Sequence, residues 1–235
     1  MNAGKIDTIL KTIAAQLADL FRNRLDFRWY PETFVCIALA LLIYPAGRFL
    51  PVEFGYENEL VENLQLIALF AAMIRCITTK HNRPLFRLIS LLLFVMMLRE
   101  TNFGKTLFYP DPVNPNEFLR WDEIPYAPYV DPVMIVYGIF AAIYFVRHRI
   151  YMFFPVFLQK GVIPVIPVIT IAVSMTASII IDKTVENCVA EETAELVFYV
   201  AFVAALWRAA DPACRWIPAF LPDRKKGAGR EKASS

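Results

Sequence analysis

Blocks of apolar residues, separated by short charged stretches, dominate the pattern along the chain. A bilayer core about 30 Å thick requires about 20 mostly apolar residues for each helix that crosses it. Short apolar runs also occur in buried helices of soluble proteins, but several in one small chain favour a membrane protein. The pattern therefore predicts an all-α, polytopic membrane protein with about six transmembrane helices. The expected spans are residues 33–51, 58–76, 84–101, 132–149, 161–182 and 192–208.

Residues 4–24 follow a different pattern, because apolar side chains recur at helical spacing while polar side chains occupy the other faces. The segment is too polar for the core of a signal peptide and has no cleavage pattern. It predicts an amphipathic helix that lies on the membrane surface. A helix packed on a partner protein is the alternative. The apolar residues are Ile6, Ile9, Leu10, Ile13, Leu17, Leu20 and Phe21.

Composition supports the membrane class and excludes several others. Hydrophobic residues make up 57% of the chain and charged residues 20%, whereas soluble domains average about 45–50% and about 25%. A net charge of +2 is too small for a nucleic-acid-binding protein. The 4 cysteines are widely spaced and form neither a zinc motif nor a disulfide framework. Glycine-rich phosphate-binding loops are absent from the sequence, so nucleotide-driven chemistry is not expected.

The distribution of basic residues predicts the orientation. They gather in the N-terminal stretch, the second and fourth connections and the tail, and cytoplasmic loops are enriched in Lys and Arg. Both termini are therefore expected in the cytoplasm, in a multi-pass protein of the inner (plasma) membrane. The expected parts are a cytoplasmic amphipathic helix (1–30), a transmembrane domain (31–209) and a basic cytoplasmic tail (210–235). The basic residues concerned are Lys5, Lys11, Arg22, Arg24, Arg28, Arg75, Lys80, Arg83, Arg87, Arg147, Arg149, Lys160, Arg208, Arg215, Arg224, Lys225, Lys226, Arg230 and Lys232.

Pairs of glutamates open the second and sixth predicted helices. Glu59 and Glu62 open the second helix, and Glu192 and Glu195 open the sixth. A spacing of three residues places each pair on one helical face. Both pairs precede an apolar run that ends in arginine, which is consistent with a parallel internal repeat. The helix dipole alone is an equal alternative, since it favours acids at helix N-termini and arginine at C-termini.

The ends of the third and fifth predicted helices bring further charges to the same outer face. A charge near the bilayer centre costs about 2.5–3.5 kcal/mol on insertion scales, so such residues turn inward, pair or line a wet cavity. The acids outnumber the bases, and we expect their crowding to keep one or more carboxyl groups protonated near neutral pH. The predicted outer-leaflet site comprises Glu59, Glu62, Arg99, Glu100, Glu192 and Glu195, with Asp182 and Lys105 beside them.

The outer connection, residues 102–131, combines five prolines with six tyrosine, tryptophan and phenylalanine residues between Phe108 and Tyr129. Proline discourages regular helix, and Tyr and Trp favour the membrane interface. The composition predicts a semi-rigid cap over the acidic helix ends, with one short helix near 116–122. It would serve as a lid or as an interfacial anchor.

Pro164 and Pro167 are expected to kink or loosen the fifth helix near its cytoplasmic end.

Three functions are consistent with this pattern. In the leading one, the glutamates bind or translocate a small cation, a proton or a polar lipid-linked solute, and Arg99 holds their geometry or binds an anionic group. In the second, the site is catalytic and acts on a lipid headgroup or a lipid-linked glycan. In the third, the charges form a structural ion-pair network in an accessory or immunity-type interaction protein. A divalent cation is the only cofactor that the pattern leaves open. The partners are the lipid bilayer and either a second copy or another membrane protein.

The string YENELVENL, Tyr56–Leu64, distantly resembles the acidic, Asn-containing cation site of alkaline ceramidases. That family is also polytopic and cleaves a lipid amide with zinc held by a set of histidines. This chain has only His81 and His148, which lie in predicted cytoplasmic connections and cannot supply the zinc ligands. The resemblance covers only this short string and assigns no family.

Overall fold

The computed structural model describes residues 11, 18–50, 60–111, 118–184 and 188–218. Helices make up nearly all of the regular structure in these residues, which confirms the all-α fold class. The long helices are α2 (Pro31–Phe49), α3 (Leu60–Thr78), α4 (Arg83–Glu100), α6 (Ala127–Arg147), α8 (Val165–Thr184) and α9 (Cys188–Ala209). The shorter elements are η1 (Leu20–Arg24), β1 (Leu25–Asp26), η3 (Asn102–Gly104), α5 (Lys105–Phe108), η4 (Trp121–Glu123), η5 (Ile150–Met152), α7 (Phe153–Lys160) and β2 (Ile163–Pro164).

The long helices α2, α3, α4, α6, α8 and α9 correspond in order to the six predicted ones, with ends shifted by a few residues. The predicted amphipathic helix at 4–24 falls mostly outside the described residues. Its last part forms the π-helix η1, which leads directly into strand β1. The short helix predicted near 116–122 overlaps the 3₁₀-helix η4 only at Trp121 and Asp122, since residues 118–120 are not helical and residues 112–117 lie outside the described part of the chain.

Three prolines occupy other positions than predicted. The segment 102–131 is predicted as one connection, but it contains α5, and α6 begins in it with Pro128 in the first turn. Proline fits there because the first N–H groups of a helix have no intrahelical partner. The fifth helix begins only at α8, so Pro164 precedes it and Pro167 lies in its first turn. Pro128 and Pro167 therefore lie in the first turns of these helices and Pro164 precedes α8, while Pro132 lies inside α6.

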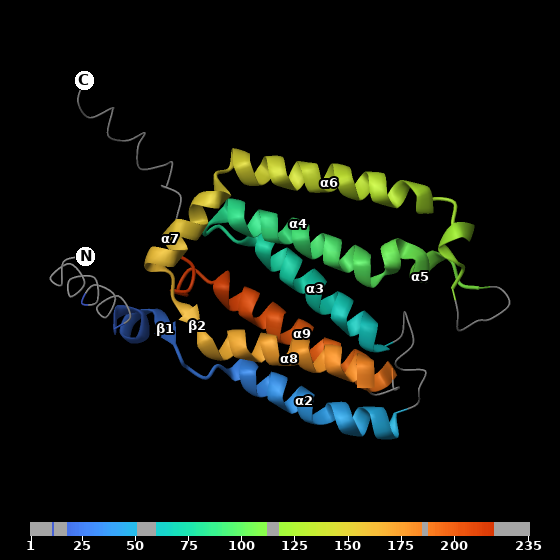
Figure 1. The fold of residues 1–235 in the computed structure, drawn as a ribbon, viewed down its shortest axis with the longest axis horizontal. Coiled ribbons are helices and arrows are strands. Elements are labelled where there is room, and N and C mark those ends of the chain that lie inside the picture. Colours follow the sequence, from blue (N-terminus) through green and yellow to red (C-terminus); the bar gives the residue numbers. More distant parts are fainter. Residues whose placement is uncertain (1–10, 12–17, 51–59, 112–117, 185–187, 219–235) are drawn as a thin grey trace, which may run out of the picture.

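Successive long helices run in opposite directions along one bundle, as Figure 1 shows. α9 lies between α2, α3 and α8 and packs against all three, while α3 also packs along α4. Small side chains explain how α9 accommodates so many neighbours, since alanine lets helix backbones approach closely. The buried alanines of α9 are Ala190, Ala194, Ala201 and Ala209. α9 is therefore the central helix of the bundle.

The main core lies between α3, α4 and α9. Leu69 of α3, Phe86 and Leu93 of α4 and Tyr199 of α9 are buried in one cluster. The indole of Trp216, beyond the end of α9, closes this cluster at one end of the bundle. A second cluster between α2, α8 and α9 is formed by Cys36, Val197 and Ala201, with partly buried neighbours from α2 and α8.

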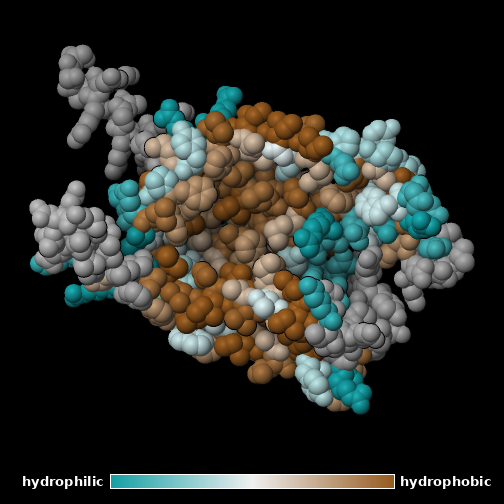
Figure 2. Space-filling model, viewed as in Figure 1, coloured by the Kyte–Doolittle hydropathy of each residue, from teal (hydrophilic) through white to brown (hydrophobic). Residues whose placement is uncertain are grey.

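Helix α6 differs from the other long helices because none of its residues is buried. It touches α4 mainly through Tyr137, whose hydroxyl donates to the carbonyl oxygen of Leu91 at 2.8 Å and whose ring lies 6.3 Å from that of Phe94. Its apolar side chains face outward, for example Ile135 at 63% and Val136 at 67% exposure. Figure 2 shows hydrophobic residues covering a hollowed face of the bundle below α6.

Two helices of the described residues, α3 and α6, are long and apolar enough to cross a membrane. Their most apolar stretches are 33% buried in α3 and 0% buried in α6. Shorter apolar stretches occupy Pro31–Ala46 of α2 and Val165–Ile181 of α8. Length and composition therefore suggest a membrane location.

The N-terminal segment is tied to the connection before α8. Strands β1 and β2 pair in parallel, with Leu25 opposite Ile163. The guanidinium of Arg24 donates to the carbonyl oxygens of Phe157 at 3.0 Å and Gly161 at 3.2 Å, which caps the last turn of α7. A Cβ at Gly161 would lie 2.6 Å from the Phe157 oxygen, so this close approach requires glycine.

Candidate functional site

The alternating helix directions bring charges of opposite sign to opposite ends of the bundle. We call the end where α3, α6 and α9 begin the acidic end, and the end where they finish the basic end. The described acids in the helices near the acidic end are Glu62, Glu100, Asp131, Glu191, Glu192 and Glu195. The described bases near the basic end are Arg22, Arg24, Arg28, Arg75, Lys80, Arg83, Arg87, Arg147, Arg149, Lys160, Arg208 and Arg215.

Gln65 joins α3 to the beginning of α9 at the acidic end. Its side chain is 0% exposed, and its Nε2 donates to Glu192 twice, at 2.9 Å to Oε2 and at 3.2 Å to the backbone oxygen. The Oε1 atom of the same amide is buried and has no hydrogen-bond donor in the described structure. A buried acceptor without a donor costs about 1–3 kcal/mol. The Gln65 amide therefore binds the Glu192 carboxylate through Nε2, while its own Oε1 lacks a hydrogen-bond donor within the described residues.

Two further predicted glutamates lie around the Gln65–Glu192 contact. Glu62, one helical turn before Gln65, is only 7% exposed. The charges of Glu195 and Glu62, and more weakly that of Glu191, act on the Glu192 carboxyl. The acids of α3 and α9 therefore form one cluster, as the sequence pattern predicts for Glu62, Glu192 and Glu195.

A second pair extends this cluster toward α4. The Tyr199 hydroxyl of α9 donates to Glu100 Oε1 at 2.5 Å. Glu195 stands one turn before Tyr199 on α9, and its charge acts on that hydroxyl as well as on Glu192. Arg99 contributes less than predicted, since its side chain is 77% exposed and its Nε lies 3.9 Å from Glu100 Oε1. Glu100 therefore has two partners, the Tyr199 hydroxyl and, at longer range, the side chain of Arg99.

The remaining predicted site residues are not joined to this cluster by a described contact. Lys105 begins the short helix α5 beyond the turn that follows α4, and within the described residues it forms no ion pair. Glu59 and the Asp182 side chain lie outside the described part of the structure.

Sequence reasoning missed Gln65 and Tyr199, the two side chains that join the helices here. The helical spacing in the sequence could have identified both residues. Gln65 follows Glu62 by three residues, and Tyr199 follows Glu195 by four, so each shares a helical face with a predicted glutamate. Both were overlooked because an amide and a phenol inside an apolar run carry no charge.

The segment between α5 and α6 folds against the end of α4. The Tyr126 hydroxyl donates to the Phe103 carbonyl oxygen at 3.0 Å, and the rings of Tyr109 and Tyr126 lie 5.5 Å apart. Asn102 and Phe103 have φ of 44° and 54°, which strains this tight turn, while the adjacent Gly104, at φ 88°, adopts a left-handed conformation that glycine favours. These contacts hold an aromatic cap at the end of α4, whereas its predicted position over the acidic helix ends stays a prediction.

The cluster presents chiefly oxygen acceptors. An ionised carboxylate only accepts hydrogen bonds, so a proton or a cation is the kind of ligand that such groups can bind. No group of three or more His, Cys, Asp or Glu side chains in the described ranges has the geometry to hold a metal ion. The arrangement suits reversible uptake of a proton or of a small cation.

Comparisons with known proteins contribute no further assignment. No protein-family model matches this chain, and neither the curated proteins nor the solved structures gave a significant match.

Proposed function

We propose that this protein is a multi-pass membrane protein that binds and exchanges a proton or a small cation at the carboxylate cluster of its acidic end. The observation that carries the proposal is the buried amide of Gln65. It holds the Glu192 carboxylate with its Nε2, while its Oε1 has no donor within the described residues. A protonated carboxyl group would supply the missing hydrogen-bond donor, and a bound cation would contact the same oxygen directly.

The exposed apolar surface supports the membrane part of the proposal. Large apolar side chains cover α6, and each fully buried side chain of this kind gains about 1.5–3 kcal/mol over an exposed one. Soluble monomers rarely expose contiguous apolar patches larger than a few hundred Å². Hydrocarbon around the bundle removes this cost. In our proposal α2, α3, α4, α6, α8 and α9 all cross the bilayer.

Charge sets the orientation in this proposal. Cytoplasmic loops of membrane proteins are enriched in Lys and Arg, and most of the described basic residues gather at one end of the bundle. The basic end then lies in the cytoplasm, together with both termini. The carboxylate cluster lies in the outer leaflet of the inner (plasma) membrane.

The position of the cluster suits exchange with the outer medium. Glu62 lies in the first turn of α3, and Glu192 directly follows the first turn of α9, near the polar surface. Glu195 stands one turn further along α9, and Tyr199 one turn beyond it. These side chains form a line of groups that are able to hold a proton, running from the helix ends into the bundle.

The test uses the full-length protein reconstituted in liposomes that contain a pH-sensitive dye. We expect an imposed potential to drive proton movement through the wild type and not through Glu192→Gln. Parallel gradients of Na⁺, K⁺ or Mg²⁺ identify a cation if protons do not move. Infrared spectroscopy of the same samples reports binding separately, because a protonated carboxyl group and a carboxylate absorb at different frequencies.

Asp131→Asn serves as the matched control. It also removes one carboxylate near the acidic end, but from an exposed position on α6. This variant is expected to retain the wild-type flux and the wild-type infrared spectrum. Equal flux and equal spectra in Glu192→Gln and the wild type would remove the proposed function.

A further inference from the structure

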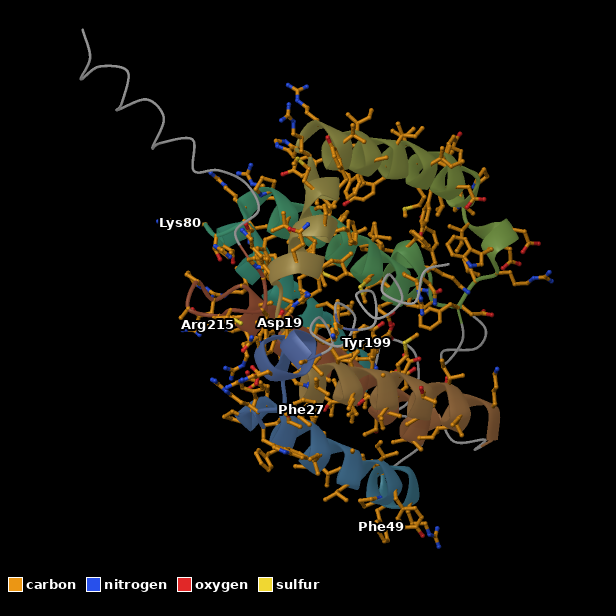
Figure 3. All side chains as sticks on the ribbon, turned by 60° about the vertical axis from the view of Figure 1, so that its left-hand side comes forward. Asp19, Phe27, Phe49, Lys80, Tyr199 and Arg215 are labelled. Atoms are coloured by element: carbon orange, nitrogen blue, oxygen red, sulfur yellow. The ribbon has the colours of Figure 1, made fainter. Side chains whose placement is uncertain are left out.

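A cavity of about 640 Å³ opens at the basic end, far from the carboxylate cluster. Its walls come from two stretches that are distant in sequence, residues 22–30 before α2 and residues 208–216 at the end of α9. Figure 3 is turned toward this end of the molecule and labels Phe27 and Arg215 there. The volume lies within the range of about 300–1,000 Å³ that is typical of small-molecule sites.

Arginine is the main charged side chain of this cavity. Arg22, Arg28, Arg208 and Arg215 line it, and all of these except Arg208 are exposed residues. Arg208 is already held, since it makes a two-pronged ion pair with Glu32 of α2. Arg28 Nε lies 3.7 Å from Asp26 Oδ1, in an exposed ion pair. The guanidinium groups of Arg22 and Arg215 therefore have the most capacity for an anionic ligand.

The acids of the cavity are engaged by neighbouring donors. Asp26 accepts hydrogen bonds from the Tyr30 hydroxyl, from the Trp216 indole at 3.4 Å and from the backbone N–H of Arg28 at 3.0 Å. Asp211 Oδ1 accepts from the backbone N–H of Ala213 at 2.8 Å. These bonds engage both oxygens of Asp26 and one oxygen of Asp211, and the lining arginines outnumber the lining aspartates.

Cysteine adds no negative charge to this surface. Cys214 lines the cavity, and burial raises the pKa of its thiol. The thiol therefore stays neutral near physiological pH, since even an unperturbed cysteine titrates above it.

Aromatic side chains surround the opening. Phe27 lines the cavity and is 54% exposed, and Trp29, two residues later, is 58% exposed. Trp216 is buried in the wall and stacks edge-on against Tyr30, with ring centroids 5.4 Å apart. Tryptophan and tyrosine favour the level of the lipid headgroups. The opening thus combines a cationic interior with an interfacial rim.

We propose that this cavity binds a phosphate-bearing anion, presented by the headgroup of an anionic phospholipid or by a soluble phosphate ester. The guanidinium fork matches two phosphate oxygens at once and forms charge-assisted hydrogen bonds with them. The aromatic rim matches the glycerol and upper acyl region of a lipid. This site is independent of the carboxylate cluster and of the proton or cation exchange proposed above.

Thermal unfolding of the purified full-length protein in a neutral detergent tests the site. The added probes are phosphatidylglycerol, phosphatidylcholine and glycerol 3-phosphate at constant ionic strength. A ligand that binds only the folded state stabilises it by RT ln(1 + L/Kd), where L is the free ligand concentration, so the rise in unfolding temperature with ligand concentration yields a Kd. We expect stabilisation by phosphatidylglycerol or by glycerol 3-phosphate, and the more effective probe identifies the source of the phosphate group.

Two double variants separate the cavity from a general charge effect. Arg22→Gln with Arg215→Gln is expected to weaken binding about tenfold or more, because two phosphate contacts are lost. Arg87→Gln with Arg147→Gln removes the same charge from exposed positions near the same end, and is expected to change the Kd by less than about twofold. Equal weakening by both pairs would overturn the proposal, because it would indicate charge attraction without a site.

A third variant addresses the cavity without changing charge. Ala213 lines the cavity and is exposed, so Ala213→Phe adds a ring there while the protein keeps its fold. We expect this variant to lose most of the stabilisation by the phosphate probe. Full stabilisation of Ala213→Phe, or no stabilisation of the wild type by either phosphate probe, would also overturn the proposal.

Discussion

Replacing Glu192 by glutamine is expected to raise the unfolding temperature of the protein while it abolishes the proposed exchange. Glutamine keeps the shape of the side chain, and its amide oxygen can still accept the bond that Gln65 Nε2 makes to Glu192 Oε2 at 2.9 Å. The substitution removes the negative charge of Glu192, which the charges of Glu195 and Glu62 repel. Repulsion of this kind in a functional site often lowers the stability of the folded state. A substitution that removes it is therefore expected to raise stability while activity is lost.

The size of the gain follows from Coulomb repulsion. Two like charges about 8 Å apart repel by about 2 kcal/mol at an effective dielectric constant of about 20. Glu192 is partly exposed, so solvent screening reduces this figure. We expect a gain of about 1–2 kcal/mol, which corresponds to about 2–8 °C for a chain of this length.

Differential scanning fluorimetry at one heating rate and at alkaline pH, where carboxyl groups are ionised, measures the effect. Asp131→Asn, at an exposed position of α6, is the control and is expected to stay within about 0.5 kcal/mol of the wild type. A lower unfolding temperature for Glu192→Gln would refute the reasoning. It would mean that the Glu192 charge holds the helices together, as the structural ion-pair interpretation requires.

Two further predictions concern the basic end. Burial tends to raise the pKa of Asp26, but hydrogen bonds from Tyr30 and Trp216 outweigh it and hold that pKa below its ordinary value. This stabilisation is present above the pKa of the unfolded chain and is lost as pH falls through the folded pKa, so acidification to about pH 3 should lower the unfolding temperature of the wild type more than that of Asp26→Asn. Circular dichroism melts at several pH values check this, and identical pH profiles would contradict it. Glu32→Gln is expected to cost about 1 kcal/mol or less, because its ion pair with Arg208 is partly exposed. Melts at low and high salt measure that cost, and a difference that grows with salt would contradict an electrostatic origin.

The order and length of the long helices could be read from the amino-acid sequence. Apolar blocks of roughly 20 residues recur along the chain, and helix formation depends on residues close together in sequence. The glutamates at the beginning of two helices were visible for the same reason. Helix starts near proline were predicted less well, because proline breaks a helix interior but suits a first turn, as Pro128 of α6 illustrates.

Only the tertiary structure determines which side chains from different helices meet in the candidate site. Gln65 and Glu192 are 127 residues apart, and they meet only because α9 packs between α2, α3 and α8. Tyr199 of α9 reaches Glu100 of α4 across 99 residues of sequence, and only the packing of the bundle brings these two side chains together. The cavity at the basic end likewise requires residues 22–30 to meet residues 208–216. Local pattern thus determined which helices form, while long-range packing determined which side chains share a site.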